Sequence, residues 1–432
     1  MRHKKRLWAV GLAVLLALVS CFSCAALGGK RVLNWISFEM AWRVVNQVHF
    51  DATFNGLDWQ ALHTRYRRQI ALASDSEYYR LVNEMLWKLN VSHLAVIPPG
   101  YWPRVEPTVL AEGSPGIDVR LFDGEAVITA VEPGSEADKA GLRPGLVIES
   151  IDGKPVEAIA ADAEAGMEPP GNERHRREAI TSGILAHLYG PANSRVSIVY
   201  LDGQGQQLEA KLTRSLRPGG IETAPGFPAN YLEFESRRLE DGIGYIHFNW
   251  FHETLAQRLP RTIASMRNAP GLIIDLRGNP GGMRDAARAG VQQLVSERVQ
   301  CSTLQRRGGT EDVVLKPAPG SYEGPLVVLI DVMSKSSSEF FAGCTQAIGR
   351  AVVIGERSPG SVGPAEIMAL PNGAGFIFPV AQETTIDGII LEDHGVIPDI
   401  EVPLDRALLA QGIDSQLEVA IDYLEHELQA SR

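Results

Sequence analysis

The sequence predicts a multidomain protein that combines α+β and α/β architecture. Three observations lead to this prediction: helical periodicity over residues 35–100, short strands with tight turns over residues 109–217, and alternating strands and helices over residues 229–405. A C-terminal helix is expected over residues 406–432. The length of 432 residues agrees with this division, because domains average roughly 150 residues.

The composition excludes several classes of protein. Lysine and arginine total 41 against 52 acidic residues, a formal charge of 41 − 52 = −11, so no nucleic-acid-binding face is predicted. The hydrophobic fraction of 45%, with 42 glycines and 26 prolines, is typical of globular domains with many turns. The four cysteines, at positions 21, 24, 301 and 344, are too few and too scattered for a disulfide scaffold or a cysteine-rich zinc site.

Residues 1–24 are predicted to be a secretory signal outside the fold. A cationic start over residues 2–6 precedes the apolar run Leu7–Val19, which is too short to cross a bilayer comfortably. The run ends in Leu18-Val19-Ser20-Cys21, which resembles the lipobox of bacterial lipoproteins, whose cysteine is acylated. We therefore expect an exported protein, periplasmic or on the outer cell surface, held to the membrane by a lipid on Cys21.

Two alternatives to the lipid anchor stay open, an ordinary signal peptide cut near Ala25 and an uncleaved anchor. Each of them still exports the bulk of the chain. In an oxidising compartment, a disulfide between Cys301 and Cys344 is permitted, although the sequence does not establish it.

The region 35–100 is predicted to be helical. Apolar residues recur at three- and four-residue steps from Phe38 to Val48, and Ser74 with Glu77 forms a capping box ahead of a second apolar face. The helical pattern then ends abruptly, and Val91–Ile97 reads as a short extended segment.

The module at 109–217 resembles a PDZ domain of the kind found with bacterial proteases, through its short strands, the glycine-rich run Pro133–Gly145 and the Asp152-Gly153 turn. The resemblance implies that a peptide adds as a strand, and that amides near 113–116 receive its terminal carboxylate. The residues expected to line this groove are Gly116, Ile117, Asp118 and Val119. A small β-rich domain without a peptide-binding role is the alternative.

One segment of this module is expected to be peripheral. Residues 157–177 are rich in alanine, glutamate and glycine and end in a polar stretch, so they are interpreted as a surface insertion with His175 in solvent.

The core at 229–405 is predicted to contain a largely parallel sheet, because the strands Ile243–Phe248, Gly271–Leu276 and Pro325–Asp331 alternate with helices. The helix over residues 254–267 must kink or restart at Pro260. Ligands of such sheets bind at the carboxyl ends of the strands.

A serine cluster, Ser334–Glu339, lies between a buried strand and a helix start in this core. A nucleophilic serine needs a base, a group that orients the base, and amide donors for the oxyanion. A helix start supplies free amides, but a serine there is by itself more often a helix cap. No Gly-x-Ser-x-Gly elbow is present, which argues against an α/β-hydrolase.

Four ordered motifs make the chemistry specific. They are Asp275–Gly282, Ser334–Gly343, Gly349–Glu356 and Glu392–Ile400. Together with the preceding helices and the PDZ-like module, they resemble the serine peptidases of the C-terminal processing (tail-specific) and tricorn type over about residues 35–405. The resemblance implies a mixed-sheet protease core of the crotonase-like, tail-specific protease type, with no cofactor and no metal.

The resemblance assigns the nucleophile to Ser336 and makes Ser334 and Ser338 structural. Tail-specific members use a serine-lysine dyad, but here Ser361 stands where the lysine is expected. Lys335 is adjacent to Ser336 in the chain and would tend to point away from it. The dyad is therefore absent.

This departure favours the tricorn-like arrangement, in which His93 is the base, Ser92 orients it and Glu392 completes the relay. Histidine titrates near neutrality and can take and return the proton of the nucleophile. His394 is the rival base, since it lies beside Glu392 in the sequence. The expected oxyanion donors are the amides of Ser337 and of Gly281 or Gly282.

Three functions compete at this stage. The first is an exported serine endopeptidase that cuts proteins or peptides whose C-termini enter the PDZ groove. The second is a catalytically inactive peptide- or ligand-binding protein on the same scaffold, and the third is an acyl hydrolase acting on a small ester. The substrate, the cleavage preference and the oligomeric state are not predicted.

Overall fold

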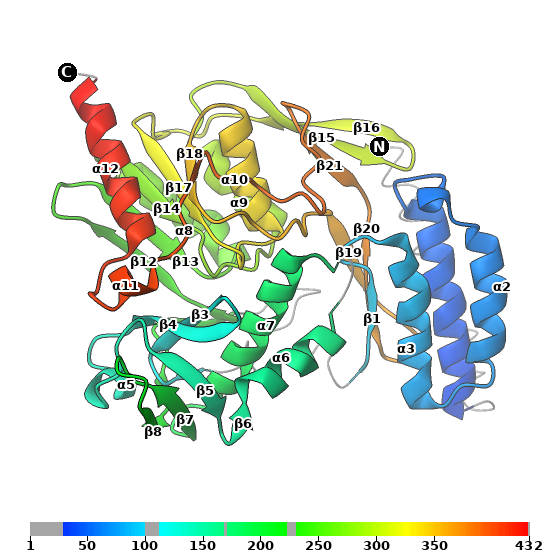
Figure 1. Cartoon of the computed structure of the whole chain (residues 1–432). Coiled ribbons are helices and arrows are strands. Elements are labelled where there is room, and N and C mark those ends of the chain that lie inside the picture. Colours follow the sequence, from blue (N-terminus) through cyan, green and yellow to red (C-terminus); the bar gives the residue numbers. More distant parts are fainter. Residues whose placement is uncertain (1–28, 100–111, 168–170, 223–229, 431–432) are drawn as a thin grey trace. The chain divides into compact units, whose positions relative to one another are not determined.

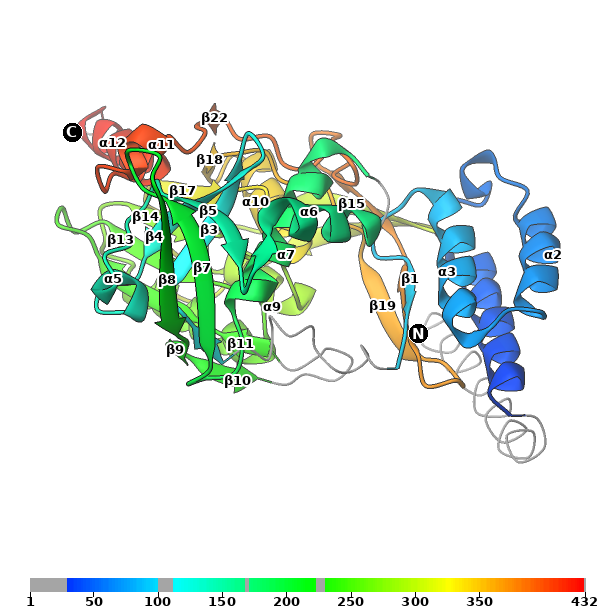
Figure 2. The ribbon, with the colours of Figure 1, turned by 60° about the horizontal axis from the view of Figure 1, so that its bottom comes forward.

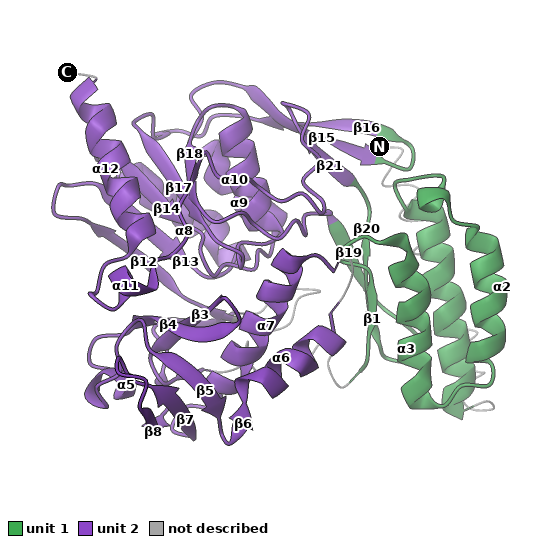
Figure 3. Ribbon diagram, viewed as in Figure 1, with its two compact units in different colours: residues 1–104, 306–309, 365–381 green, residues 105–305, 310–364, 382–432 purple. Residues whose placement is uncertain are grey.

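A computed structural model describes residues 29–99, 112–167, 171–222 and 230–430. The chain divides into two compact units, shown in Figure 3: unit 1 comprises residues 1–104, 306–309 and 365–381, and unit 2 comprises residues 105–305, 310–364 and 382–432. The predicted signal segment with Cys21 lies outside the described residues. Among the described helices, none is both long and apolar enough to cross a bilayer.

Unit 1 packs helices against a small sheet. Its helices are residues 29–48, α2 Trp59–Ile70 and α3 Asp75–Leu86, with 3-10 turns η1 Phe54–Gly56 and η2 Trp87–Leu89 (Figure 1). Its strands are β1 Ala95–Ile97, β19 Ala365–Ala369 and β20 Gly375–Pro379, paired antiparallel in the order β1-β20-β19. Buried side chains such as Phe38, Tyr78, Met85 and Phe376 join the helices and the sheet into one core.

The predicted capping box of α3 is confirmed. The Ser74 amide donates to the Glu77 carboxylate (2.9 Å), and the Glu77 amide donates to Ser74 Oγ (3.4 Å). At the other end, Asn90 adopts a left-handed conformation with φ 50°, which terminates the helical run. The chain then passes through Ser92 and His93 into β1.

The N-terminal half of unit 2 is an antiparallel β-rich module. Its main sheet has the order β3-β4-β5-β7-β8, so β3 is an edge strand. The strands are β2 Gly113–Ser114, β3 Ile117–Phe122, β4 Glu125–Val131, β5 Val147–Ile151, β6 Lys154–Pro155, β7 Arg195–Leu201, β8 Gln207–Thr213 and β9 Ser215–Leu216. The helices are α5 Glu136–Lys139, α6 Val156–Ala165 and α7 Glu173–Leu188, with α6 and α7 side by side in Figure 2.

The interpretation of residues 157–177 as a solvated insertion is wrong. They form most of α6 and the first turn of α7, and Ile159, Ile180 and Ile184 of these helices are buried in the core of the module. His175 is not in solvent, since only 5% of its surface is exposed.

The second half of unit 2 is built on a six-stranded sheet of order β12-β13-β14-β17-β18-β22. Only β12 runs antiparallel to its neighbour, so the predicted largely parallel sheet is observed. The strands are β12 Phe234–Arg238, β13 Gly244–Phe248, β14 Leu272–Asp275, β17 Leu326–Ile330, β18 Val352–Gly355 and β22 Ile400–Glu401. Every residue of β14 and β17 is buried, as expected for strands covered on both faces.

Helices cover this sheet. They are α8 Glu253–Ser265, α9 Arg284–Gln292, α10 Ser337–Ala347, α11 Arg406–Leu409 and α12 Ser415–Ala430. Ala420 and Leu424 of α12 pack on Ile273 and Val327, while α9 packs between α8 and α10. The helix α8 continues through Pro260 without a restart.

Three smaller sheets complete unit 2 among the described residues. They are the pair β2 and β9, the pair β10 Gly220–Glu222 and β11 Asn230–Leu232, and the three-stranded sheet of β15 Val299–Arg306, β16 Gly309–Leu315 and β21 Gln382–Thr385. A disulfide joins Cys301 of β15 to Cys344 of α10, with 5.1 Å between the Cα atoms. This bond ties α10 to the strand behind it.

Candidate active site

The candidate site of unit 2 lies where three neighbouring parallel strands end. In register, Asp275 of β14 pairs with Leu329 of β17, and Ile330 of β17 pairs with Gly355 of β18. The chain segments that follow these strands therefore start at the same edge of the sheet. They are the glycine-rich loop 276–283, the segment 331–336, which leads into the serine cluster Ser334–Glu339, and the loop 356–363.

Ser336 is the N-cap of α10 and has an unusual backbone, with φ 57° and ψ −112°. A non-glycine residue rarely adopts such angles, and strain of this kind costs about 1–3 kcal/mol. The Ser336 amide donates to Glu339 Oε2 (2.9 Å), which holds the backbone in this conformation. At the start of α10, backbone amides point out of the N-terminal end of the helix, which is the end where Ser336 lies.

The glycine-rich loop approaches Ser336 closely. A Cβ on Gly281 would lie 2.7 Å from Ser336 Cβ and 2.6 Å from Lys335 O, so no larger residue fits there. The Gly281 amide already donates to Asn279 Oδ1 (2.9 Å). The amides of Gly282 and Ser337 have no acceptor among the described residues, which leaves these two as the available donors for an oxyanion.

The other members of the cluster have structural contacts. Ser334 Oγ donates to Leu276 O (2.8 Å), and Ser338 Oγ donates to Asn279 O (2.9 Å), so both tie the serine cluster to the glycine-rich loop. Lys335 Nζ lies 3.3 Å from Glu178 Oε1 of α7. These contacts leave Ser336 as the serine presented at the helix start.

The first residues of the Asp275–Gly282 motif form a buried ion pair. Arg277 donates to both carboxylate oxygens of Asp275 and reaches Asp414 at the start of α12. Burial would raise the pKa of Asp275, but the Arg277 charge lowers it to about 2. This ion pair stabilises the end of β14, from which the glycine-rich loop begins.

Glu339 is a fully buried carboxylate behind Ser336. Besides the Ser336 amide, it accepts hydrogen bonds from Ser358 Oγ (2.6 Å), the Gly360 amide (2.6 Å) and the Ser361 amide (3.0 Å). Burial raises the pKa of Glu339 to about 7, and the negative charge of Glu392 acts in the same direction. The sequence motif contained Glu339, but its role was not predicted.

Glu392 binds the next part of the same loop. Its Oε2 accepts hydrogen bonds from the amides of Val362 (3.0 Å) and Gly363 (3.1 Å). Four consecutive amides, from Gly360 to Gly363, are thus held by two carboxylates. The loop includes Ser361, the residue at the expected lysine position.

The predicted Ser92-His93 pair belongs to unit 1. Ser92 Oγ lies 2.8 Å from His93 Nδ1, and His93 has a positive φ of 56° between η2 and β1. When Nδ1–H donates to Ser92 Oγ, Nε2 is the ring nitrogen that carries the lone pair. The pair therefore has the internal geometry of an oriented base.

The rival base His394 lies in unit 2. Its Nδ1 donates to the carbonyl of Gly395 (2.9 Å), and its own carbonyl accepts from Arg357 Nε (2.7 Å). The first contact is with the next residue and the second is with a residue 37 positions earlier, and both fix the chain after Glu392.

The predicted PDZ groove residues lie at or just before the edge strand β3 of the module's main sheet. Ile117, Asp118 and Val119 begin β3, which pairs on one side with β4 and has α7 packed beside it. Gly116 has φ 85°, which favours glycine, and its amide is engaged by Ser114 Oγ (2.9 Å). A strand-like peptide could add between β3 and α7.

The same helix α7 contacts the second half of unit 2, which the sequence did not predict. His175 Nε2 lies 2.9 Å from Ser361 Oγ, Arg174 Nε donates to Ser358 O (3.1 Å), and Arg177 donates to Glu356 (3.2 Å). Burial lowers the pKa of His175 to about 4, so the imidazole is neutral at pH 7. The asparagine cap of α7, Asn172, was the one sequence signal that a helix starts here.

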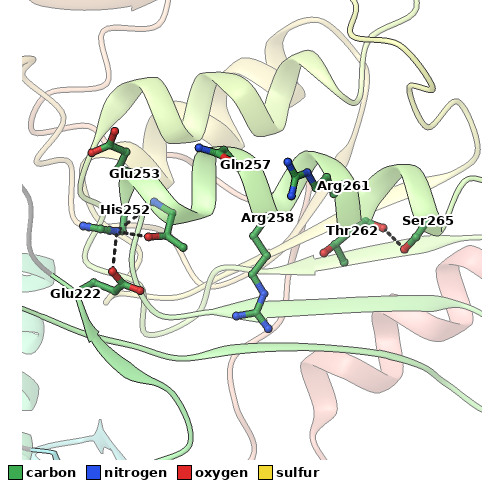
Figure 4. A pocket seen from close by; sticks show the side chains of 9 residues that line it. Glu222, His252, Glu253, Gln257, Arg258, Arg261, Thr262 and Ser265 are labelled. Carbon is green, nitrogen blue, oxygen red and sulfur yellow. Dashed lines mark hydrogen bonds and ion pairs between the residues drawn. The ribbon is translucent and has the colours of Figure 1, made fainter.

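A cavity of about 620 Å³ lies along α8 (Figure 4). Its lining includes Glu222, His252, Gln257, Arg258 and Arg261. His252 Nδ1 accepts from the Thr254 amide (3.2 Å), as a helix cap does. Among the described residues, no group of three or more histidine, cysteine or acidic side chains could hold a metal ion.

Comparison with known families agrees with this architecture. The model of peptidase family S41 matches residues 242–402, that of the tricorn protease C1 domain matches residues 37–87, and that of the PDZ domain matches residues 127–176. Together these three matches support a likeness to the C-terminal processing, tricorn-type peptidases of family S41. The chain carries a PDZ domain and acts on protein or peptide substrates, and the predicted multidomain fold class is confirmed.

Similar proteins cover most of this chain. A carboxyl-terminal-processing protease of Synechocystis sp. is 28% identical over 393 residues, which cover 89% of this chain and 85% of the relative. A chloroplastic C-terminal processing peptidase of Tetradesmus obliquus is 26% identical over 417 residues, 91% of this chain and 82% of the relative.

Solved structures show the same fold. The photosystem II D1 C-terminal processing protease aligns with a TM-score of 0.57 and 22% identity over 89% of this chain and 98% of that one. Mature CPAF aligns with a TM-score of 0.57 and 15% identity over 92% and 97%.

Proposed function

We propose that this peptidase is an exported serine endopeptidase in which Ser336 is the nucleophile, His93 the general base, Ser92 the residue that orients His93, and Glu392 the end of the relay. The observation that carries the proposal is the strained Ser336 at the start of α10, beside the available amides of Gly282 and Ser337. Strain at a serine next to two free donors is typical of a catalytic nucleophile.

The proposed reaction has two steps. His93 Nε2 takes the Ser336 hydroxyl proton while Oγ attacks the scissile carbonyl, and the oxyanion receives the amides of Gly282 and Ser337. His93 then gives the proton to the leaving amine, which breaks the C–N bond and leaves an acyl-enzyme. Water, activated by the same histidine, releases the second product. Of the predicted oxyanion donors, Gly281 contributes by its close approach rather than by its engaged amide.

The PDZ domain is proposed to bind the C-termini of substrates. Gly116, Ile117, Asp118 and Val119 offer the edge of β3 to an extended tail, with α7 as the opposite wall. Relatives named as C-terminal processing proteases support this substrate class.

Export with a lipid on Cys21 is part of the proposal. The names of two relatives place them in chloroplasts, which is compatible with a protein that leaves the compartment of its synthesis. Radiolabelled palmitate fed to expressing bacteria should label the wild-type chain but not Cys21→Ala, and equal labelling of both would exclude the anchor.

The test of the chemistry is cleavage of fluorescein-labelled β-casein by the purified protein. Ser336→Ala and His93→Ala should each lower the rate by at least about 1,000-fold, as the loss of a nucleophile or base does. The exposed Ser265→Ala is the matched control and should keep the wild-type rate. Undiminished cleavage by Ser336→Ala would refute the nucleophile, while an active His93→Ala with an inactive His394→Ala would move the base to His394.

A further inference from the structure

The PDZ-domain helix α7 places a buried histidine next to Ser361, a residue of the loop that the Glu339 carboxylate holds. His175 lies in the first turn of α7, and its Nε2 lies 2.9 Å from Ser361 Oγ. Its Nδ1 is buried and has no hydrogen-bond partner among the described residues, which costs about 1–3 kcal/mol. A polar side chain placed at such a cost for one contact indicates that the contact itself matters.

Ser361 is joined to Ser336 through a single atom. The amides of Ser361 and Ser336 both donate to Glu339 Oε2, at 3.0 Å and 2.9 Å. Whatever moves Ser361 therefore moves the acceptor that holds the strained Ser336 backbone. Ser361 also occupies the position expected for the lysine of tail-specific relatives. His175 therefore contacts the residue that stands in place of this lysine.

Other contacts of α7 surround the same point. Glu178, one turn after His175, pairs with Lys335, which precedes Ser336. Arg174 donates to Ser358 O, whose own side chain donates to Glu339. Contacts from α7 thus reach the chain on both sides of the Glu339 carboxylate.

We propose that His175 of the PDZ domain is a positioning residue for the peptidase reaction, acting through Ser361 and Glu339 on Ser336. This inference rests on the proposed role of Ser336 as the nucleophile. Because a displacement of about 1 Å can cost roughly 100-fold in rate, loss of the contact should lower kcat more than it changes KM.

The experiment measures kcat and KM for fluorescein-labelled β-casein with the full chain. His175→Ala and Ser361→Ala should each lower kcat by about 10- to 100-fold with KM within about 3-fold. The double variant should be no slower than the slower single one, since both remove the same contact. His175→Gln keeps a hydrogen-bonding group at the Nε2 position and should restore kcat to within about 3-fold of wild type.

The control is His187→Ala, at the other end of α7, where the imidazole contacts only the carbonyl of Gly183 in the hydrogen bonds of the described residues. It should keep the wild-type kcat. Thermal midpoints identify a variant that fails to fold, and Ser361→Ala, which removes one atom, carries the test if His175→Ala does not fold.

Three results would overturn the inference. They are an unchanged kcat in Ser361→Ala, additive losses in the double variant, or a His175→Gln as slow as His175→Ala, which would assign proton transfer to the imidazole instead. Failure of the proposed function is a separate result, because Ser336→Ala would then cleave casein at the wild-type rate whatever His175 does.

Discussion

Two loops flank the start of α10, and they are built in different ways. The loop 276–283 after β14 brings its backbone against Ser336 through Gly281 and leaves the amide of Gly282 available. The loop 356–363 after β18 has its amides from Gly360 to Gly363 occupied by Glu339 and Glu392. The first loop can therefore contact a substrate, whereas the second holds the serine in place.

The largest effect on cleavage is expected from a substitution in the first loop, 276–283. In Gly281→Ala, the added Cβ would lie 2.6–2.8 Å from Lys335 O, Ser336 Cβ and Ser337 N, so Ser336 must shift. We expect casein cleavage to fall by about 100- to 1,000-fold, as for loss of oxyanion geometry. Gly134→Ala is the matched control, because its φ is also positive at +75° but nothing lies within 4 Å. Equal activity of the two variants would show that the close approach has no role in the reaction.

An intermediate effect is expected in the second loop. Glu339→Gln keeps the shape but removes the charge that four donors share, so kcat should fall by about 10- to 100-fold. Burial raises the pKa of Glu339 from 4.5 to about 7, so the folded state binds an extra proton between these pH values. The free energy of unfolding contributed by Glu339 is thus fully present below pH 4.5 and declines as the pH rises to about 7.

Urea unfolding at pH 5 and pH 8 measures this component. Between these pH values, the wild type should lose about 1–3 kcal/mol more of its free energy of unfolding than Glu339→Gln. An identical change with pH in both proteins would place the titration elsewhere.

The smallest effect on the reaction is expected from the disulfide. Replacing Cys301 and Cys344 with alanine should lower the free energy of unfolding by about 2–4 kcal/mol, because the bond closes a loop with a sequence separation of 43. The kcat of the folded variant should stay within about 3-fold, since neither sulfur contacts the two loops in the hydrogen bonds of the described residues. A loss of kcat as large as that of Glu339→Gln would instead make the tether part of the active site.

The sequence was informative where the chemistry follows the chain locally. The buried strands, the glycines before α9 and the serine at the start of α10 all occupy positions set by neighbouring residues, so their pattern predicts them. The motif order added the likeness to the family, while the roles of Ser336, His93 and Glu392 stay predictions.

The contacts of α7 could not be predicted in the same way. Its first turn is polar, and the partner of His175 is 186 residues away in the sequence. When a polar helix face is buried against a polar loop, the sequence shows no periodic pattern of apolar residues. Such a face is therefore interpreted from the sequence as exposed to solvent. The role of Glu339 was not predicted for a related reason, because its four hydrogen-bond donors come from segments on both sides of it in the sequence.

The contacts of α7 also determine whether the PDZ domain of this protein can be exchanged for another. PDZ domains are commonly treated as exchangeable cassettes, but here Arg174, His175 and Arg177 bind the peptidase core directly. A chimera with a foreign PDZ domain would therefore change the peptidase as well as the choice of tail. The recognition module and the catalytic module of this chain have to be inherited, or engineered, together.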